Sequence, residues 1–383
     1  MMQINPDVVA AYPITPQTAL MQKFADFHAD GEVDTELVLV ESEHSAMSAC
    51  VGSSAAGART MTATSANGLA LMFEIVYIAA STRLPIVMPV VNRALSAPIN
   101  IQCDHSDSMA CRDSGWIQLY SRNAQEAYEN TIMAMRIAEH PDVLLPTMVC
   151  LDGFITSHGM ENVTVYDKAD VQAFIGTYEP TNHLLDPELP VTIGPLDFSD
   201  YYFEHKRGQI DAMNAARRVM LDVSKEFAAK FGTRDYGYFK PYHLDDAETA
   251  IIVLNSTGGT VEYVVDELRA KGEKVGALSL RCFRPFPGEE LADALSHVKA
   301  VAVMDRLESF GALGGPVYNE LRSVMFDMDA RPKIISRTYG LGGKTVDNEH
   351  IHTLFAELKT LAGGGSADQH GYLNVREPAG SSA

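Results

Sequence analysis

The sequence predicts an α/β fold, with strands in parallel sheets and helices on both sheet faces. Short apolar runs alternate with helical patterns over residues 1–160, and the alternation starts again near residue 249. A chain of 383 residues is too long for one ordinary hydrophobic core, which favours two domains. Hydrophobic residues make up 46% and charged residues 21%, as is typical of globular proteins.

The first region, residues 1–160, contains strands that are separated by helices. The predicted strands are residues 7–12, 36–41, 60–64, 85–91 and 143–151. The predicted helices are residues 17–29, 44–57, 67–81 and 124–139. Such an order is typical of a parallel sheet, because each helix carries the chain back to the start of the next strand. Residues 92–116 form a long predicted loop, and loops of that length are usually functional or linkers.

A second unit of the same kind follows. Its predicted strands are residues 249–255, 274–280, 299–305 and 333–340, with a helix over 258–272 that a glycine ends. We therefore predict a first domain over 1–160 and a connector with a long helix over 161–245. A second α/β domain follows over 246–362, and residues 363–383 form an extended or disordered tail.

Charge and composition exclude several classes of function. The net charge of −20 argues against a nucleic-acid partner, whose phosphates need a basic face. No apolar run approaches the roughly 20 residues that cross a bilayer, and no secretory leader is visible. The five cysteines form no C-x-x-C pair, so we expect reduced, mostly buried thiols. These features predict a cytoplasmic protein without a membrane partner.

The stretch VVAAYPITPQTALMQKF, residues 8–24, places Thr15 between two prolines at the end of the first strand. Because a residue before proline is extended, Thr15 is predicted as the N-cap of helix 17–29, with Pro16 as the first helical residue. The same position lies at the carboxyl end of a strand, where open α/β sheets bind ligands. One hydroxyl can cap the helix and also face a ligand.

Polar residues follow four successive predicted strands of the first region. Glu41 and Glu43 end the second strand, although an acidic helix start is also common for structural reasons. The turn from Ser65 to Gly68 ends the third strand, and Arg93 follows the fourth. Because the carboxyl ends of parallel strands share one edge of the sheet, we expect these groups to form a site.

The long loop carries Asp104, His105 and Asp107, which suggest either a metal site or a hydrogen-bond network. Their spacing is too tight for a clean set of metal ligands, and no second cluster supports one. We expect the network, and we predict no metal ligand in this chain.

Six motifs occur in order along the chain: AYPITPQT, VESEHSAM, TATSANGLALM, RLPIVMPVVNRALSAP, CDHSDSMACRDSGW and LDGFITSH. Together they resemble the alpha subunit of the multi-subunit pyruvate:ferredoxin oxidoreductase family over about residues 4–360. The resemblance implies a thiamine-diphosphate-binding fold in the first domain and a transketolase C-terminal-like fold in the second. The sequence departs from the family at one point: members usually carry a further glycine- and alanine-rich strand and helix ahead of the segment QINPDVVAAYPITP, whereas this sequence starts at MMQINPDVV.

The resemblance implies half of an active site. The expected reaction is thiamine-diphosphate-dependent oxidative decarboxylation of pyruvate with coenzyme A, giving acetyl-CoA and CO2. A beta subunit would share the thiamine diphosphate and hold its diphosphate and Mg2+. Iron–sulfur clusters on partner subunits, from a beta, gamma and delta set, would pass the electrons to ferredoxin. The alternatives are another 2-oxoacid (2-oxoglutarate, 2-oxoisovalerate or oxalate), a non-catalytic assembly subunit, or a self-sufficient thiamine enzyme, which the missing Mg2+ motif disfavours.

The resemblance also assigns roles to residues. Glu43 is the expected catalytic carboxylate, facing N1′ of the aminopyrimidine, where burial would favour its protonated form. Glu41 is the rival and matches the motif less well. Arg93 is expected to bind the substrate carboxylate through its planar fork, and Thr15 to hydrogen-bond the substrate. Further cofactor contacts are expected from Ser65, Asn67 and Gly68.

Overall fold

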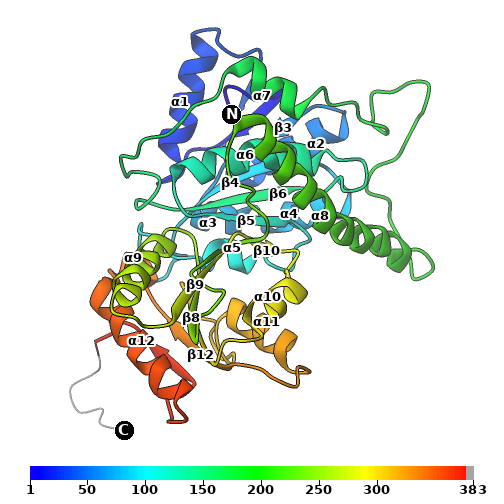
Figure 1. Cartoon of the computed structure of the whole chain (residues 1–383). Helices are drawn as coiled ribbons and strands as arrows, with labels where there is room; N and C mark the ends of the chain where they lie inside the picture. Colours follow the sequence, from blue (N-terminus) through cyan, green and yellow to red (C-terminus); the bar gives the residue numbers. More distant parts are fainter. Residues whose placement is uncertain (377–383) are drawn as a thin grey trace.

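The computed structural model describes residues 1–376, which build two sheets that lie one above the other in Figure 1. The first sheet has the strand order β10-β5-β6-β4-β3-β1-β2, and all of its strands except β10 run parallel. Its strands are β1 (Val8–Ala11), β2 (Glu36–Leu39), β3 (Thr60–Met61), β4 (Val87–Asn92), β5 (Ile117–Ser121), β6 (Thr147–Asp152) and β10 (Cys282–Arg284).

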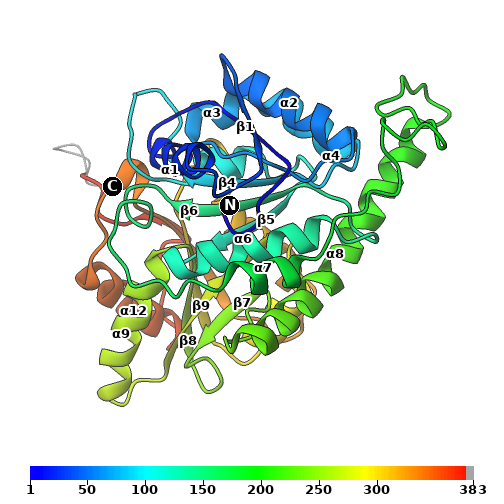
Figure 2. The same cartoon turned by 90° about the horizontal axis from the view of Figure 1, so that it is seen from above.

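Helices cover both faces of the first sheet, and Figure 2 shows α2, α3 and α4 opposite α6, α7 and α8. The side chains of β4 alternate between these layers. Met88 and Val90 pack in the core with α2 and α4, whereas Val87 packs in the core with α1 and α6. The helices are α1 (Thr18–Ala29), α2 (Glu43–Ala55), α3 (Ala66–Leu71), α4 (Phe73–Ser81), α5 (Ser106–Ala110), α6 (Ala124–Ala138), α7 (Lys168–Ile175) and α8 (Tyr202–Phe231).

The second sheet has the order β13-β12-β11-β8-β9-β7, and only β7 runs antiparallel among these strands. Its strands are β7 (Phe239–Tyr242), β8 (Thr249–Leu254), β9 (Val275–Leu280), β11 (Ala300–Asp305), β12 (Lys333–Thr338) and β13 (His370–Tyr372). One face packs against α9 (Thr257–Ala270) and α12 (Asn348–Ala362), and the other against α10 (Gly288–Leu295) and α11 (Pro316–Met325). Buried residues fill β8, β9 and β11, as expected when both faces are covered.

The predicted α/β class is confirmed, and each predicted strand and helix of the two regions corresponds to an observed element. Four short strands were not predicted: β5 in the first region, β7 in the predicted connector, β10 in the second region, and β13 in the predicted tail. Helix 67–81 is divided into α3 and α4 at Met72. The domain limits remain a prediction, because β7 and β10 both pair with strands on the other side of a predicted limit. Residues 377–383 of the predicted tail lie outside the described residues.

Thr15 is not the N-cap of the first helix, so this prediction was wrong. Helix α1 begins at Thr18, its N-cap residue is Gln17, and no side chain caps it. The physical reason is the turn over residues 15–17. Gln17 is fully buried, donates from Nε2 to the Ala63 carbonyl at 3.0 Å, and accepts at Oε1 from the Ile14 amide at 3.2 Å. This side chain holds the turn against the end of β3, so the helix starts after it.

The two sheets meet where the ends of β8 and β11 reach the end of β6. Asn255 and Arg306, just after those two strands, donate to the carboxylate of Asp152, the last residue of β6. The long loop of residues 93–105 runs through the same junction. Among residues 1–376, no helix combines the length and apolarity needed to cross a bilayer.

Candidate active site

Arg93 follows β4 directly and is 8% exposed. Its Nη1 donates to the Thr15 carbonyl at 2.9 Å, and its Nε donates to the Asn100 carbonyl at 3.0 Å. Among the residues that the structure describes, Arg93 forms no ion pair, and its Nη2 has no acceptor. The structure therefore brings Thr15 and Arg93 together, and it leaves a buried positive charge free to bind an anion.

Asp107 joins two of the predicted turns. Its Oδ2 accepts from the Arg93 amide at 3.0 Å and from the Ala66 amide at 2.9 Å. Its Oδ1 accepts from Asn92 Nδ2 at 2.7 Å and from the Ser108 amide at 2.7 Å. Burial raises the pKa of Asp107 to about 6, although these four donors favour the charged form.

Ala66 needs this support. Its φ is 43°, in the left-handed region that a residue with a side chain adopts at a cost of roughly 1–2 kcal/mol. The bond from the Ala66 amide to Asp107 offsets that cost and fixes the turn from Ser65 to Gly68 beside the end of β4.

Glu43 lies at the start of α2 and is 7% exposed. A Cβ placed on Gly68 would lie 2.8 Å from Glu43 Oε1 and 2.6 Å from Thr64 Oγ1, so the carboxylate packs directly against the predicted turn. Among the described residues, the Glu43 carboxylate accepts no hydrogen bond, and the buried Thr64 hydroxyl has no partner. Buried polar atoms without a partner are unusual in proteins and are expected where a ligand binds.

Glu41 is a weak rival to Glu43. Its side chain is exposed, and the hydroxyl of Ser45 donates to it at 2.5 Å, which lowers the pKa of Glu41. The Ser42 hydroxyl accepts from the Ser45 amide and caps α2. The contacts of Glu41 are therefore those of a residue that stabilises the start of α2.

The other predicted cofactor contacts, Ser65 and Asn67, lie beside Glu43 but differ in which of their hydrogen-bonding groups have partners within the chain. The Ser65 hydroxyl donates to the Val91 carbonyl at 2.6 Å, so its hydrogen is already used within the chain. Asn67 is exposed, and its Oδ1 accepts from the amide and the hydroxyl of Ser96 at 3.3 Å each. The side-chain nitrogen of Asn67, Nδ2, has no acceptor among the residues that the structure describes. Their binding roles remain predictions.

Two other arginines were possible substrate ligands. Arg83 donates to the backbone carbonyls of Val143, Leu144 and Gly208, which lie before β6 and in α8, away from Arg93. Arg112 lines a groove of about 770 Å3 beside the site, and its Nε lies 3.7 Å from Asp113 Oδ2. Arg93 is the buried cation among the three.

The loop residues Asp104 and His105 form the predicted hydrogen-bond network. Asp104 accepts from the Ser106 amide and hydroxyl and from the Gly342 amide. His105 is fully buried, and its Nε2 lies 2.8 Å from Asp152 Oδ1. The Asp104 carboxylate and His105 Nε2 are therefore bound within the chain, whereas the buried His105 Nδ1 has no partner among the described residues.

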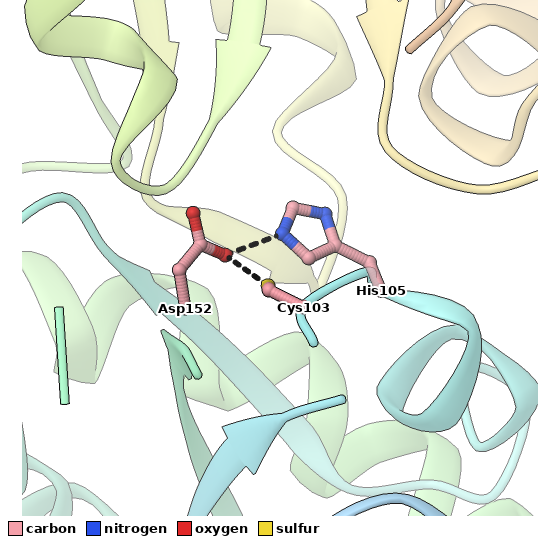
Figure 3. A group of neighbouring side chains, drawn as sticks. All are labelled: Cys103, His105 and Asp152. Atoms are coloured by element: carbon pink, nitrogen blue, oxygen red, sulfur yellow. Dashed lines mark hydrogen bonds and ion pairs between the residues drawn. The ribbon is translucent and has the colours of Figure 1, made fainter. Parts of the chain in front are cut away.

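Cys103, His105 and Asp152 lie close enough to suggest metal ligands (Figure 3). The Asp152 oxygens, however, already accept from Cys103, His105, Asn255, Ser256 and Arg306. Burial alone would raise the pKa of Asp152, but Arg306 and His105 hold it well below its usual range. Burial and the nearby Asp152 raise the pKa of the Cys103 thiol, which suits its role as a hydrogen-bond donor to Asp152. This group is a structural junction.

The sequence analysis did not identify Gln17 or Asp152 as residues that hold this region together, and it did not show that Asp107 connects two turns. Gln17 appeared only as a residue within a predicted helix, and no local pattern shows that its amide reaches β3. Asp152 lies one residue beyond the predicted strand 143–151, so its position at a strand end was a usable signal. Its partners Asn255, Ser256 and Arg306 come from the second unit, and only the fold brings them to Asp152.

Two family models match this chain. The thiamine-diphosphate-binding domain of the pyruvate flavodoxin/ferredoxin oxidoreductases matches residues 1–225. Core domain II of pyruvate:ferredoxin oxidoreductase matches residues 247–351.

Relatives of known name align over nearly the whole chain. "Pyruvate synthase subunit PorA" of Thermotoga maritima is 58% identical over 98% of this chain and 95% of its own length. The protein of the same name from Methanocaldococcus jannaschii is 49% identical over 92% of this chain and 90% of its own. "Ketoisovalerate oxidoreductase subunit VorA" of Pyrococcus abyssi is 42% identical over 94% and 91%.

Two solved structures share the fold. A 2-oxoglutarate:ferredoxin oxidoreductase from Magnetococcus marinus superposes with a TM-score of 0.68 at 18% identity, and this chain spans 94% of itself and 63% of that chain. A split-gene transketolase superposes with a TM-score of 0.55 at 11% identity, over 93% of each chain. These likenesses confirm the predicted order of a thiamine-diphosphate-binding fold and a second α/β domain.

Proposed function

The chain belongs to the pyruvate flavodoxin/ferredoxin oxidoreductase family and is an oxidoreductase component, and from that premise we propose that it supplies the substrate-binding half of a pyruvate-oxidising site. The expected reaction converts pyruvate and coenzyme A to acetyl-CoA and CO2 with ferredoxin as the acceptor. One observation carries the proposal. Arg93 is a buried cation without a carboxylate partner among the described residues, beside Thr15 and close to the turn that packs on Glu43.

Pyruvate is the substrate that the relatives favour. The two more similar of the relatives above are named pyruvate synthase subunits, at 58% and 49% identity, and the ketoisovalerate relative is at 42%. Arg93, which has no ion-pair partner among the described residues, matches the single carboxylate of pyruvate, and Thr15 is small enough to leave room for its methyl group. Other 2-oxoacids are the runners-up. A purified complex assayed with pyruvate, 2-oxoisovalerate, 2-oxoglutarate and oxalate would rank them, and a lower KM for any other acid would replace pyruvate.

The residues beside Glu43 fit the aminopyrimidine end of thiamine diphosphate. The Glu43 carboxylate and the Thr64 hydroxyl are free of partners in the described chain, and Gly68 leaves the space between them open. Glu43 would hydrogen-bond N1′ of the ring, and Asn67 Nδ2 would be a further donor. Thiamine diphosphate supplies the nucleophilic carbon and the electron sink for decarboxylation when it is bound.

The rest of the machinery is proposed to lie on partner subunits of a multi-subunit complex. Among the described residues, no second acidic cluster accompanies this site that could hold Mg2+ and a diphosphate, and the cysteines are buried singly. We therefore assign the diphosphate, Mg2+ and the iron–sulfur clusters to beta, gamma and delta subunits. Electrons would reach ferredoxin through one of those subunits, in the cytoplasm.

The test is Arg93→Ala in the complete complex. The expected result is a rise of about 10- to 100-fold in the KM for pyruvate, the size of a lost charge-assisted hydrogen bond, with partial rescue by guanidinium. Arg112→Ala is the matched control, because Arg112 lines the neighbouring groove and should leave the KM within twofold. An unchanged KM in Arg93→Ala, or a larger rise in Arg112→Ala, would contradict the proposal.

A further inference from the structure

The loop that follows Arg93 is attached to the second sheet at several points. Asn100 Nδ2 donates to the Gly342 carbonyl at 3.1 Å, and the Gly343 amide donates to the Cys103 carbonyl at 2.8 Å. The His105 amide donates to the Arg306 carbonyl at 2.9 Å. The loop of residues 94–105 therefore depends on the second sheet for its shape.

The same loop holds Arg93 directly. The Asn100 carbonyl accepts from Arg93 Nε at 3.0 Å. The Ala94 amide donates to the Gln102 carbonyl at 3.0 Å and closes the loop at its base. Asn100 therefore has three contacts: its carbonyl accepts from the guanidinium, its Nδ2 donates to the Gly342 carbonyl, and its Oδ1 accepts from the Gln102 amide within the loop at 2.6 Å.

The contact on the second sheet is a turn of residues 340–343, which we name the glycine turn. Gly342 and Gly343 have φ of 55° and 79°, where side chains are disfavoured. A Cβ on Gly343 would lie 2.5 Å from Gln102 Cβ, and a Cβ on Gly342 would lie 2.3 Å from Asn100 Nδ2. Glycine is needed there because the loop approaches the turn so closely.

Arg306 fixes the glycine turn to the first sheet. Its Nη1 donates to Asp152 Oδ2 at 3.0 Å, and its Nε donates to the Gly340 carbonyl at 3.3 Å. Arg306 is 4% exposed and Asp152 is fully buried, so solvent screens this ion pair little. The turn is thereby held against the carboxyl end of β6, next to the end of β4 where Arg93 begins.

We infer that the glycine turn of the second domain is a positioning element for substrate binding, which fixes the loop that aims the Arg93 guanidinium at the substrate carboxylate. This inference rests on the proposed role of Arg93. A loosened loop would leave Arg93 to be ordered when the substrate binds, at a cost to affinity. The second domain then acts on the KM for pyruvate without contacting the reacting atoms.

Two variants in the complete complex test this inference. Asn100→Ala removes the donor to Gly342 and the acceptor of the Gln102 amide, and keeps the carbonyl that binds Arg93. Gly343→Ala pushes against Gln102 and leaves the Asn100 side chain in place, so an effect that both variants share reports the contact with the glycine turn. Both should raise the KM for pyruvate about 3- to 10-fold, the cost of ordering one long side chain, with kcat within twofold. Amide hydrogen exchange of residues 94–103 should become faster in both variants, a readout that does not depend on activity.

Each variant has a matched control. Asn374→Ala removes a similar amide bond, from Nδ2 to the Thr345 carbonyl at 2.8 Å, in the second unit. Gly272 has φ of 83° and no atom within 4 Å of its Cβ position, so Gly272→Ala brings backbone strain of the same kind without the contact. Both controls should leave the KM unchanged. A purely structural role would instead lower the melting temperature and kcat of the test variants and leave the KM as in the wild type.

A double variant separates this inference from the proposed function. If Asn100 acts through Arg93, then Asn100→Ala should add no further rise in KM to Arg93→Ala. An equal rise in both backgrounds would overturn the inference and leave the role of Arg93 standing. If Arg93→Ala itself leaves the KM unchanged, the proposed function fails and this inference fails with it.

Discussion

The same edge of the first sheet carries two sets of acidic and basic side chains that differ in how many hydrogen-bond and ion-pair partners they have within the chain. Asp152 and Arg306 form a buried ion pair, and Asp152 accepts from five different residues. Glu43 and Arg93 are buried to a similar degree, yet among the described residues neither has an ion-pair partner. The Asp152 carboxylate therefore has all its partners within the chain, although His105 Nδ1 and Asn255 Oδ1 beside it have none among the described residues, whereas the Glu43 carboxylate has no partner there.

This difference in partners distinguishes side chains that stabilise the fold from side chains that are available to bind a ligand. Burying a charge costs free energy unless partners compensate it, so the junction stabilises the arrangement of the two sheets only as a complete set. Hydrogen-bonding groups without partners, as at Glu43 and Arg93, lower the stability of the free chain. Such groups are retained where a ligand supplies the missing partners. Changes at the junction should therefore alter stability, whereas changes near Glu43 should alter turnover.

Glu43→Gln should have the largest effect of the substitutions considered for this edge. Loss of an acid–base group typically slows turnover by about 10²- to 10⁴-fold, and assembly should be intact because Glu43 has no partner to lose within the described chain. The measurement is kcat of the reconstituted complex together with its melting temperature. Glu41→Gln, two residues earlier, is the control and should retain kcat. Near-normal turnover of Glu43→Gln would remove this residue from the mechanism.

Arg306→Leu tests the other region. Leaving Asp152 buried without its cation should lower the free energy of unfolding by about 3–5 kcal/mol. Arg337→Leu is the control, because Arg337 is equally buried but its partner Glu357 is 30% exposed and can be hydrated. Chemical denaturation of both variants measures the effect. The double variant Asp152→Asn/Arg306→Leu should recover part of the loss, and an equal loss in Arg306→Leu and Arg337→Leu would contradict a special role for the buried Asp152–Arg306 ion pair.

Gly68→Ala sharpens the comparison by filling the free space beside Glu43. Its Cβ would lie 2.8 Å from Glu43 Oε1, and overpacking of this kind costs about 1–3 kcal/mol. We expect the concentration of thiamine diphosphate for half-maximal activity to rise about 5- to 150-fold. Gly259→Ala, in a helix with no atom within 4 Å of the Cβ position, is the control and should be neutral. Unchanged cofactor affinity would show that the cofactor does not bind beside Gly68.

The pH dependence should be the smallest effect. The pKa of Asp107, raised by burial to about 6, lies above its ordinary 3.8. This carboxyl therefore stabilises the fold below about pH 4 and loses that contribution as the pH rises through 6. Substrate binding should change in the opposite direction, because the charged form accepts from the Arg93 and Ala66 amides.

The KM for pyruvate should accordingly rise about tenfold from pH 7 to pH 5, following the loss of the ionised form. Asp107→Asn should remove this pH dependence. Asp305, the last residue of β11, is the matched control, since its pKa is also raised by burial to about 6 but its carboxylate accepts from the amides of Val317 and Tyr318 at the start of α11. Asp305→Asn should retain the wild-type profile, and a pH dependence that survives in Asp107→Asn would contradict the assignment.

Much of this edge was predictable because its signals are local. Strand ends carrying Thr15, Glu43, Ser65 and Arg93 follow from apolar runs and turn residues, and parallel strands bring such ends to one edge. The carbonyl of Thr15 was not predictable as the group that meets Arg93, since it depends on the turn that Gln17 stabilises. The predicted cap failed for the same reason.

Strand β10 and the glycine turn could not be predicted from the sequence, because both depend on contacts between residues that are distant along the chain. Strand β10 has three residues and forms only beside β5, from which it is separated by more than 150 residues along the chain. The glycine turn has no pattern that indicates a partner, and its contact with Asn100 spans 242 residues. Sequence reasoning can place the residues of a site, but the residues that hold them in position came from the fold.

Strand β10 also bears on how this polypeptide can be divided. It covers the β5 edge of the first sheet, and its own segment belongs to the second half of the chain. A fragment that stops before residue 246 would leave the backbone groups of β5 unpaired and open to pairing with another molecule. The two halves are therefore suited to be produced together, and a shortened first half is expected to self-associate.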